Sequence, residues 1–264
     1  MKKLESGAYQ DNPGEDEFFI GWAKAPGIDR RFLIGALPLS LGLTTAAAWG
    51  VSSSLPDPGA GAWLTNATHE IEGLLSLNPY PMIFVPDASR PGGVDTVLVI
   101  AEGKCTSSLK LAEQEDMWVR ASGVLIERGS RQALEVPLTH YDWLQVIDPP
   151  ASALVEPDQE WLGTMDLRGT IMDTKCFFGV MKPARSKTHK ACASLCIRGG
   201  IPPSFWARTK DGRESVLLMT DANGGPLKEE ILPLVAEPVS AKGEVVRVGD
   251  ILHFRADPSA YKLL

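Results

Sequence analysis

Three of the chain's four cysteines lie in one short segment, together with one of its four histidines. Cys176 comes first, and His189, Cys192 and Cys196 follow it. Thiolate sulfur and imidazole nitrogen are ligands that soft and borderline metal ions prefer, so these four side chains could bind Zn²⁺ or Cu(I) if the fold brings them together. The segment from Asp173 to Pro203 is therefore the first place to look for chemistry.

The part of this segment from Ser186 to Gly200 predicts a short helix. Ser186 can cap its N-terminus, and either of the two final glycines can end it in a left-handed conformation. His189, Cys192 and Cys196 then lie at positions i, i+3 and i+7, which share one face of a helix. Their spacing from Cys176 matches none of the standard zinc patterns.

Disulfide bonding is the competing prediction, because exported thiol pairs usually oxidise. A bond from Cys176 to Cys192 or Cys196 would close a loop and contribute about 3 kcal/mol. Cys192 and Cys196 do not pair easily with each other, since their Cβ vectors run side by side along the helix. The remaining thiol would be free or paired with Cys105. Disulfide, metal or redox-active thiols, and buried reduced thiols all stay open. The disulfide alternative needs no cofactor, whereas the metal alternative needs Zn or Cu.

The chain has no charged residue from Phe32 to Pro56. Residues 32–51 are long enough to cross the hydrocarbon layer as a helix, which takes about 20 residues. Arg30 and Arg31 precede this stretch, and no Lys or Arg follows it until position 90. The positive-inside rule then places the N-terminus in the cytoplasm and the main body in the periplasm of a bacterium. We predict a single-pass protein of the cytoplasmic membrane.

Two features near this stretch have alternative interpretations. The run Ala46–Ala48 could be a signal-peptidase site, which would remove the anchor but leave the body in the same compartment. Upstream, Phe18, Phe19 and Trp22 predict an interfacial segment at the level of the lipid headgroups, or a docking element for a membrane partner.

The composition is that of a folded protein, with 44% hydrophobic and 22% charged residues. A formal net charge of −7 argues against nucleic acid as a partner, because phosphate binding needs a basic surface. Short apolar runs separated by Gly, Pro and Asp predict a mainly β body. The strands that we expect are 97–100, 118–126, 133–138, 216–219, 239–246 and 251–254.

Three blocks of sequence repeat within the body. Residues 70–75 match 166–171, residues 97–100 match 216–219, and residues 119–129 match 239–249. In the third block of each copy, a Gly (Gly123 or Gly243) opens a strand that ends in a Gly turn. Two tandem small β-barrels of the oligonucleotide/oligosaccharide-binding (OB) type suit this pattern, and one continuous β-sandwich is the alternative. The second copy carries roughly 24 more residues between its first two blocks, where the Cys/His segment lies.

These patterns divide the chain into six parts: a cytoplasmic segment (1–31), a transmembrane helix (32–51), a linker (52–62), a first barrel-like module (63–148), a junction (149–163) and a second module (164–264) with an insertion at 174–203.

A pattern in the second module resembles that of small exported bacterial OB-like domains of unknown function. It consists of Gly-Thr-Ile-Met-Asp-Thr-Lys-Cys (169–176), then His-Lys-Ala-Cys-Ala-Ser-Leu-Cys (189–196) and a Gly-rich turn. The resemblance covers about residues 165–255. It implies the fold and the compartment, and no activity.

The insertion is also the basic part of the chain. Between Thr174 and Lys210 there are eight Lys or Arg and no Asp or Glu. Such a segment could face anionic lipid headgroups or an acidic protein partner. The candidate contact residues are Lys182, Arg185, Lys187, Lys190 and Arg198.

Sequence motifs typical of enzymes are absent, including a nucleophile elbow, a phosphate-binding loop, His-Glu-x-x-His and Cys-x-x-Cys-His. The absence of these motifs favours a non-catalytic protein. We expect a membrane-anchored accessory or partner-binding subunit of an integral membrane complex, such as a respiratory or electron-transfer complex. The alternative is a periplasmic metal-binding or thiol-redox protein that uses Cys176, His189, Cys192 and Cys196.

Overall fold

The computed structural model describes residues 27–54, 61–106, 111–140, 142–151, 156–208, 214–227 and 229–264. The chain divides into two units, residues 1–57 and residues 58–264. The predicted interfacial residues Phe18, Phe19 and Trp22 lie outside the described residues.

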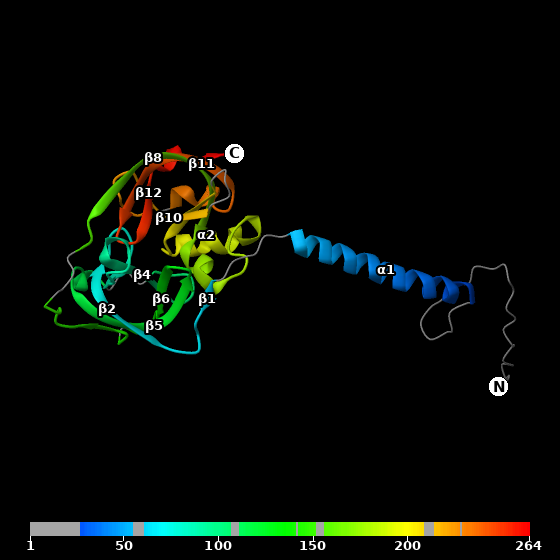
Figure 1. Cartoon of the computed structure of the whole chain (residues 1–264), viewed down its shortest axis with the longest axis horizontal. Helices are drawn as coiled ribbons and strands as arrows, with labels where there is room; N and C mark the ends of the chain where they lie inside the picture. Colours follow the sequence, from blue (N-terminus) through cyan, green and yellow to red (C-terminus); the bar gives the residue numbers. More distant parts are fainter. Residues whose placement is uncertain are drawn as a thin grey trace, which may run out of the picture. The chain divides into compact units, whose positions relative to one another are not determined.

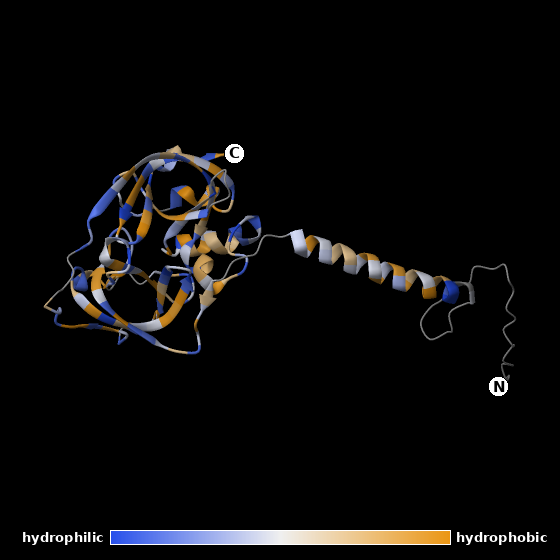
Figure 2. Cartoon of the chain, viewed as in Figure 1, coloured by the Kyte–Doolittle hydropathy of each residue, from blue (hydrophilic) through white to orange (hydrophobic). Residues whose placement is uncertain are grey.

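The described part of the first unit is one helix, α1 (Gly27–Ser54), which includes the predicted span at 32–51. It is long and apolar enough to cross a membrane over Asp29–Ser54. Arg30 and Arg31 are exposed in its first turn. Figure 2 shows hydrophilic colouring at the N-terminal end of this helix and mostly apolar colouring along the rest.

The second unit is mainly β and contains two sheets (Figure 1). The first sheet contains β1 (Ala62–Trp63), β2 (His69–Ser76), β3 (Met82–Pro86), β4 (Val94–Ala101), β5 (Trp118–Arg128), β6 (Arg131–Val136) and β7 (Leu144–Val146). The second sheet contains β8 (Gln159–Asp173), β9 (Pro203–Arg208), β10 (Glu214–Thr220), β11 (Pro238–Val248), β12 (Ile251–Arg255) and β13 (Lys262–Leu263). All six strands predicted by range are present, with boundaries shifted by a few residues.

Each sheet closes on itself through five strands that pair in the same order. In the second sheet β8 pairs with β9, β9 with β10, β10 with β12, β12 with β11, and β11 again with β8. In the first sheet β2, β3, β4, β6 and β5 form the equivalent ring. In both rings the third and fifth strands are parallel and every other pair is antiparallel. Closure leaves no free edge in either ring of five.

Glycines in the repeated blocks occupy equivalent places. A Cβ atom at Gly73 would lie 2.3 Å from the carbonyl oxygen of Phe84, and one at Gly169 would lie 2.0 Å from that of Trp206. Both glycines lie on the first strand of their ring, where its backbone comes close to that of the paired second strand. Only a residue without a side chain allows this approach. The Gly of the first repeated block is therefore a packing requirement in each ring.

The middle block of the predicted repeat is out by one residue. Val97 faces the interior of the first ring, and its counterpart in the second ring is Leu217, whereas the sequence aligned it with Val216. Val216 packs in the shared core together with Leu98. A run of apolar residues aligns equally well in either register, so this block did not fix which side chains point inward.

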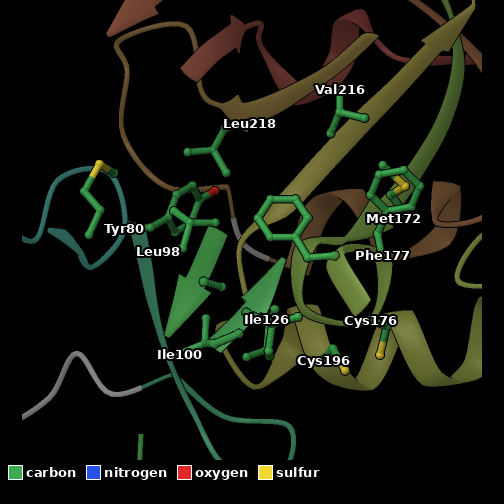
Figure 3. Packing of buried hydrophobic residues seen from close by; sticks show 14 of the residues in the cluster. Tyr80, Leu98, Ile100, Ile126, Met172, Cys176, Phe177, Cys196, Val216 and Leu218 are labelled. Carbon is green, nitrogen blue, oxygen red and sulfur yellow. The ribbon is translucent and has the colours of Figure 1, made fainter. Parts of the chain in front are cut away.

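Three hydrophobic clusters stabilise the second unit. One fills the first ring and one fills the second. The third contains side chains from both sheets, so the two rings share a core (Figure 3). Its labelled members are Tyr80, Leu98, Ile100, Ile126, Met172, Cys176, Phe177, Cys196, Val216 and Leu218.

Short helical turns occupy the connections. They are η1 (Pro91–Gly93), η3 (Ala112–Gln114), η4 (Cys176–Val180), η5 (Lys187–His189), η6 (Glu229–Leu234) and η7 (Pro258–Ala260). The single α-helix described in this unit, α2 (Lys190–Arg198), lies with η4 and η5 in the connection between β8 and β9.

Candidate functional site

The long connection between β8 and β9 carries the three clustered cysteines. Cys176 begins the turn η4 directly after β8, and both Cys192 and Cys196 lie on α2. The three Sγ atoms lie within 4.8 Å of one another. The Sγ atoms of Cys176 and Cys192 are 3.9 Å apart. Three of the four side chains that the sequence predicted as ligands therefore converge.

The turn that holds Cys176 is fixed by a buried carboxylate. Asp173 is fully buried, and its Oδ1 accepts a hydrogen bond of 2.8 Å from the backbone N–H of Cys176. Its Oδ2 lies 3.0 Å from Nε2 of His189, which is also buried. His189 thus packs against Asp173 and Cys176, and it is not grouped with Cys192 and Cys196.

The helix differs from the prediction at its start and agrees with it at its end. A turn, η5, precedes α2, and the N-cap of α2 is His189 rather than Ser186, whose side chain makes no capping hydrogen bond. Gly200 adopts a positive φ of +95° after the helix, as predicted for its left-handed end. This conformation suits Gly, which has no Cβ penalty there.

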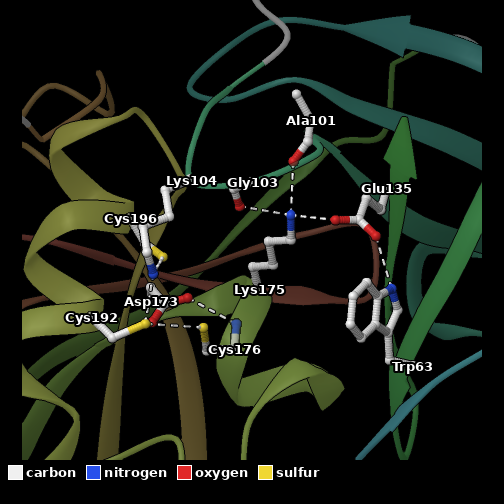
Figure 4. Close-up of polar contacts among 10 residues, drawn as sticks. All are labelled: Trp63, Ala101, Gly103, Lys104, Glu135, Asp173, Lys175, Cys176, Cys192 and Cys196. Atoms are coloured by element: carbon white, nitrogen blue, oxygen red, sulfur yellow. Dashed lines mark hydrogen bonds and ion pairs between the residues drawn. The ribbon is translucent and has the colours of Figure 1, made fainter. Parts of the chain in front are cut away.

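Lys104 approaches the thiols from the first ring (Figure 4). Its Nζ donates a hydrogen bond of 2.7 Å to Sγ of Cys192 and lies 3.7 Å from Sγ of Cys196. The loop that carries Lys104 rests on the end of α2, where Gly199 accepts a hydrogen bond of 2.9 Å from the backbone N–H of Thr106. A Cβ atom at Gly199 would lie 1.7 Å from the carbonyl oxygen of Lys104. The glycine therefore permits the contact that positions the lysine.

A second lysine anchors the connection to the first ring. Lys175 is 3% exposed, and its Nζ forms an ion pair of 2.5 Å with Glu135. It also donates hydrogen bonds of 2.8 Å and 2.9 Å to the carbonyl oxygens of Ala101 and Gly103. These partners use all three donors of the ammonium group. Glu135 in turn accepts a hydrogen bond of 2.8 Å from the indole of Trp63.

The thiols influence one another's protonation. A hydrogen bond between Cys176 and Cys196 raises the pKa of Cys176 and lowers the pKa of Cys196, and burial adds to the rise at Cys176. The hydrogen bond to Cys192 raises the pKa of Lys104. Of these two thiols, Cys196 therefore loses its proton more easily than Cys176.

The predicted disulfide is not formed. All four cysteines lie in described parts of the chain, and all four are free thiols. The separation of 3.9 Å between the Sγ atoms of Cys176 and Cys192 is far longer than a disulfide bond of about 2.05 Å. Cys176 is held by Asp173, while Cys192 faces Lys104. Cys105 is half-buried on the lysine-bearing loop, and it does not belong to the three-thiol cluster.

The basic side chains of the insertion are partly paired within the chain. Arg185 lies 3.6 Å from Glu214 and stacks over Trp206, while Lys187 and Lys190 lie 3.3 Å and 2.8 Å from Glu237. The acidic partners come from outside the insertion, which is why its sequence alone shows no compensation. The charge available to an external partner is correspondingly smaller, with Lys182 and Arg198 exposed.

Sequence reasoning missed Lys104 and Met181. Lys104 is 88 residues away from Cys192, and nothing in the sequence near it marks it as a neighbour. Met181 follows Cys176 closely, and its Sδ lies 3.7 Å from Sγ of Cys192. A sulfur count over the insertion that included methionine would have found it. No family model, curated protein or solved structure matches the chain.

Proposed function

We propose that this chain is a membrane-anchored protein whose β body binds one thiophilic metal ion, Zn²⁺ or Cu(I), at Cys176, Cys192 and Cys196. The observation that carries the proposal is the convergence of the three Sγ atoms within 4.8 Å of one another. Sulfur atoms around one ion at about 2.3 Å lie about 3.8–4 Å apart in a tetrahedral or trigonal arrangement. The separation of 3.9 Å between Cys176 and Cys192 fits that arrangement.

The surroundings of the thiols also favour a metal site. Second-shell hydrogen bonds orient metal ligands in proteins. Here Asp173 fixes the backbone of Cys176, and the shared core holds Cys176 and Cys196. A rigid ligand set lowers the entropic cost of binding an ion.

Elemental analysis of the full chain, purified in detergent under reducing conditions, tests the proposal. We expect about one metal ion per chain in the wild type and a loss of most of it in Cys192→Ser. Cys105→Ser is the matched control, because this cysteine lies outside the three-thiol cluster. Equal metal content in wild type and Cys192→Ser would contradict the proposal.

The pairing order supports a finer fold proposal, that the two rings are tandem OB-like barrels. OB barrels are five-stranded Greek-key barrels. Each ring here has a three-stranded meander, a parallel pairing of the third and fifth strands, and a fourth strand that pairs with the first. The resemblance of the second module to exported OB-like domains agrees with this order.

We also propose an orientation for the chain in the membrane, based on α1. The arginines at its start and the absence of Lys or Arg after it until position 90 favour a cytoplasmic N-terminus and a periplasmic body. Protease digestion of intact spheroplasts tests the orientation. We expect the β body to be accessible from outside. Protection of the body until the membrane is permeabilised would contradict it.

A role as accessory subunit of a membrane complex is the second candidate function. It is favoured by α1 and by exposed apolar side chains on the insertion, Met181 at 41% and Leu195 at 50%. Blue-native electrophoresis of membranes tests it. We expect the wild-type chain in a band larger than its own mass, and Leu195→Asp in a smaller one. Identical migration as a free chain would contradict this role.

A further inference from the structure

The donor atoms of the three-thiol cluster are all sulfur. Met181 adds a thioether 3.7 Å from Sγ of Cys192, whereas on the other side the carboxylate of Asp173 and the imidazole of His189 lie within 4.8 Å of Sγ of Cys176. His189 is turned to Asp173 instead. Thiolate and thioether ligands select Cu(I), whereas imidazole and carboxylate ligands suit harder divalent ions. The three thiols and the neighbouring thioether therefore favour a soft monovalent ion.

A cation lies beside two of the three thiols. A structural Zn²⁺ site normally has four protein ligands in a tetrahedron. Here Lys104 lies beside Cys192 and Cys196, and an ammonium group has three donors and no lone pair to offer a metal. Three thiolates without a fourth ligand suit the trigonal coordination that Cu(I) accepts.

The positive charge of Lys104 also favours Cu(I) over Zn²⁺. Repulsion between the ammonium of Lys104 and a bound metal scales with the charge of the metal, so it is half as large for Cu(I) as for Zn²⁺ at the same distance. Three thiolates around Cu(I) also leave a larger net negative charge than three thiolates around Zn²⁺. The lysine at 2.7 Å from Cys192 can compensate that charge.

The cluster has one open side. Cys176 and Cys196 are buried at 3% and 1% exposure, whereas Cys192 is half-buried. The exposed Met181 lies next to Cys192. An ion arriving from solvent or from a donor would therefore meet the thioether and Cys192 before the two buried thiols.

From these contacts we infer that the ion is Cu(I), bound by the thiolates of Cys176, Cys192 and Cys196, with Lys104 as the compensating charge and the Met181 side as the entrance. This inference rests on the proposed function and narrows it to one ion. Binding releases the thiol protons to solvent and changes no oxidation state.

Competition between the two ions tests the inference. The reduced full chain in detergent is titrated without oxygen against Cu(I) held by bicinchoninate, and separately against Zn²⁺ held by a chromogenic chelator. Both ions are then offered together. We expect one Cu(I) per chain, withdrawn from bicinchoninate, and no retained Zn²⁺ in the mixture. Retention of Zn²⁺ in preference to Cu(I) would overturn the inference and leave the proposed function standing. Binding of neither ion would overturn both.

Variants of Lys104 test the role of its charge. We expect Lys104→Gln to weaken Cu(I) binding about tenfold, as loss of a second-shell group does at other metal sites. Lys104→Arg keeps the charge and should stay close to wild type. Lys190→Gln is the matched control, since this lysine pairs with Glu237 away from the thiols. Equal Cu(I) affinity in Lys104→Gln and Lys190→Gln would show that Lys104 does not compensate the charge of the bound ion.

Discussion

The two rings have the same strand order and differ most in one connection. β2 and β3 are joined by residues 77–81, whereas β8 and β9 are joined by residues 174–202. Each connection nevertheless reaches the opposite ring. The short one places the hydroxyl of Tyr80 2.8 Å from the carbonyl oxygen of Met219, and the long one pairs Lys175 with Glu135. Both connections therefore anchor one ring to the other, and only the long one also carries thiols.

In a closed barrel, chemistry can be added on a connection between strands. The interiors of the two rings are filled mainly with apolar side chains, and every strand of each ring is paired on both sides. A long connection can carry a helix and a turn without disturbing strand pairing, because loop-closure entropy grows slowly with length. The candidate site therefore lies on the connection, between the rings.

The largest expected effect comes from the anchor of the long connection. Lys175→Met leaves the carboxylate of Glu135 buried without its ion-pair partner, which typically costs about 3–5 kcal/mol. Urea unfolding of the full chain in detergent, followed by tryptophan fluorescence, measures the loss. The double variant Lys175→Met, Glu135→Met removes both charges and should recover part of it. A single variant as stable as wild type would mean that the connection is not held by this pair.

The next effect depends on pH and distinguishes the second ring from the first. His253 pairs with Leu218 across the parallel strands, at the place where Ala133 pairs with Leu98 in the first ring. Burial lowers the pKa of His253 from 6.5 to about 4. Between these two pH values the unfolded chain binds a proton that the folded chain does not. The unfolding free energy therefore falls as the pH is lowered through this window, by about 3 kcal/mol at most.

Unfolding curves at pH 7 and pH 4.5 check this expectation. His253→Ala copies the residue of the first ring, and it should show a smaller loss of stability between the two pH values than wild type. An equal loss in both proteins would show that other groups cause the acid sensitivity.

A third effect tests the equivalence of the rings directly. Gly73→Ala and Gly169→Ala each place a Cβ atom against a carbonyl oxygen, at 2.3 Å and 2.0 Å. Overpacking of this kind typically costs about 1–3 kcal/mol. We expect similar losses of unfolding free energy from the two variants. A loss of unfolding free energy in Gly169→Ala with none in Gly73→Ala would mean that the two close backbone contacts are not equivalent.

The smallest effect concerns the short connection. Tyr80→Phe removes a hydroxyl that donates to Met219 and accepts a hydrogen bond of 3.0 Å from the backbone N–H of Leu227. Loss of both bonds in a buried place should cost about 1–2 kcal/mol, which is less than loss of the buried ion pair. If Tyr80→Phe destabilises the protein more than Lys175→Met, the short connection is the stronger anchor.

Much of the second unit could be predicted from local sequence. Apolar runs marked six strands, and the repeated glycines marked equivalent positions in the two rings. The cysteines indicated the insertion as the place of the candidate site. These features depend on residues close together in the chain.

The contacts between the rings could not be predicted in this way. The shared core, the Lys175–Glu135 pair and the position of Lys104 depend on how two modules pack, and a single sequence has no local signal for that. The disulfide was expected from compartment statistics. The structure instead places Asp173 and Lys104 against the thiols, which holds the sulfur atoms at a separation that suits an ion.

Metal binding by the three free thiols is tested most directly by the intact mass of the full chain. The chain is purified in detergent, and its mass is measured under native and denaturing conditions. We expect the full thiol mass after denaturation and, in the native spectrum, that mass plus one metal ion. A denatured mass lower by about two mass units for each disulfide, with no metal in the native spectrum, would contradict it.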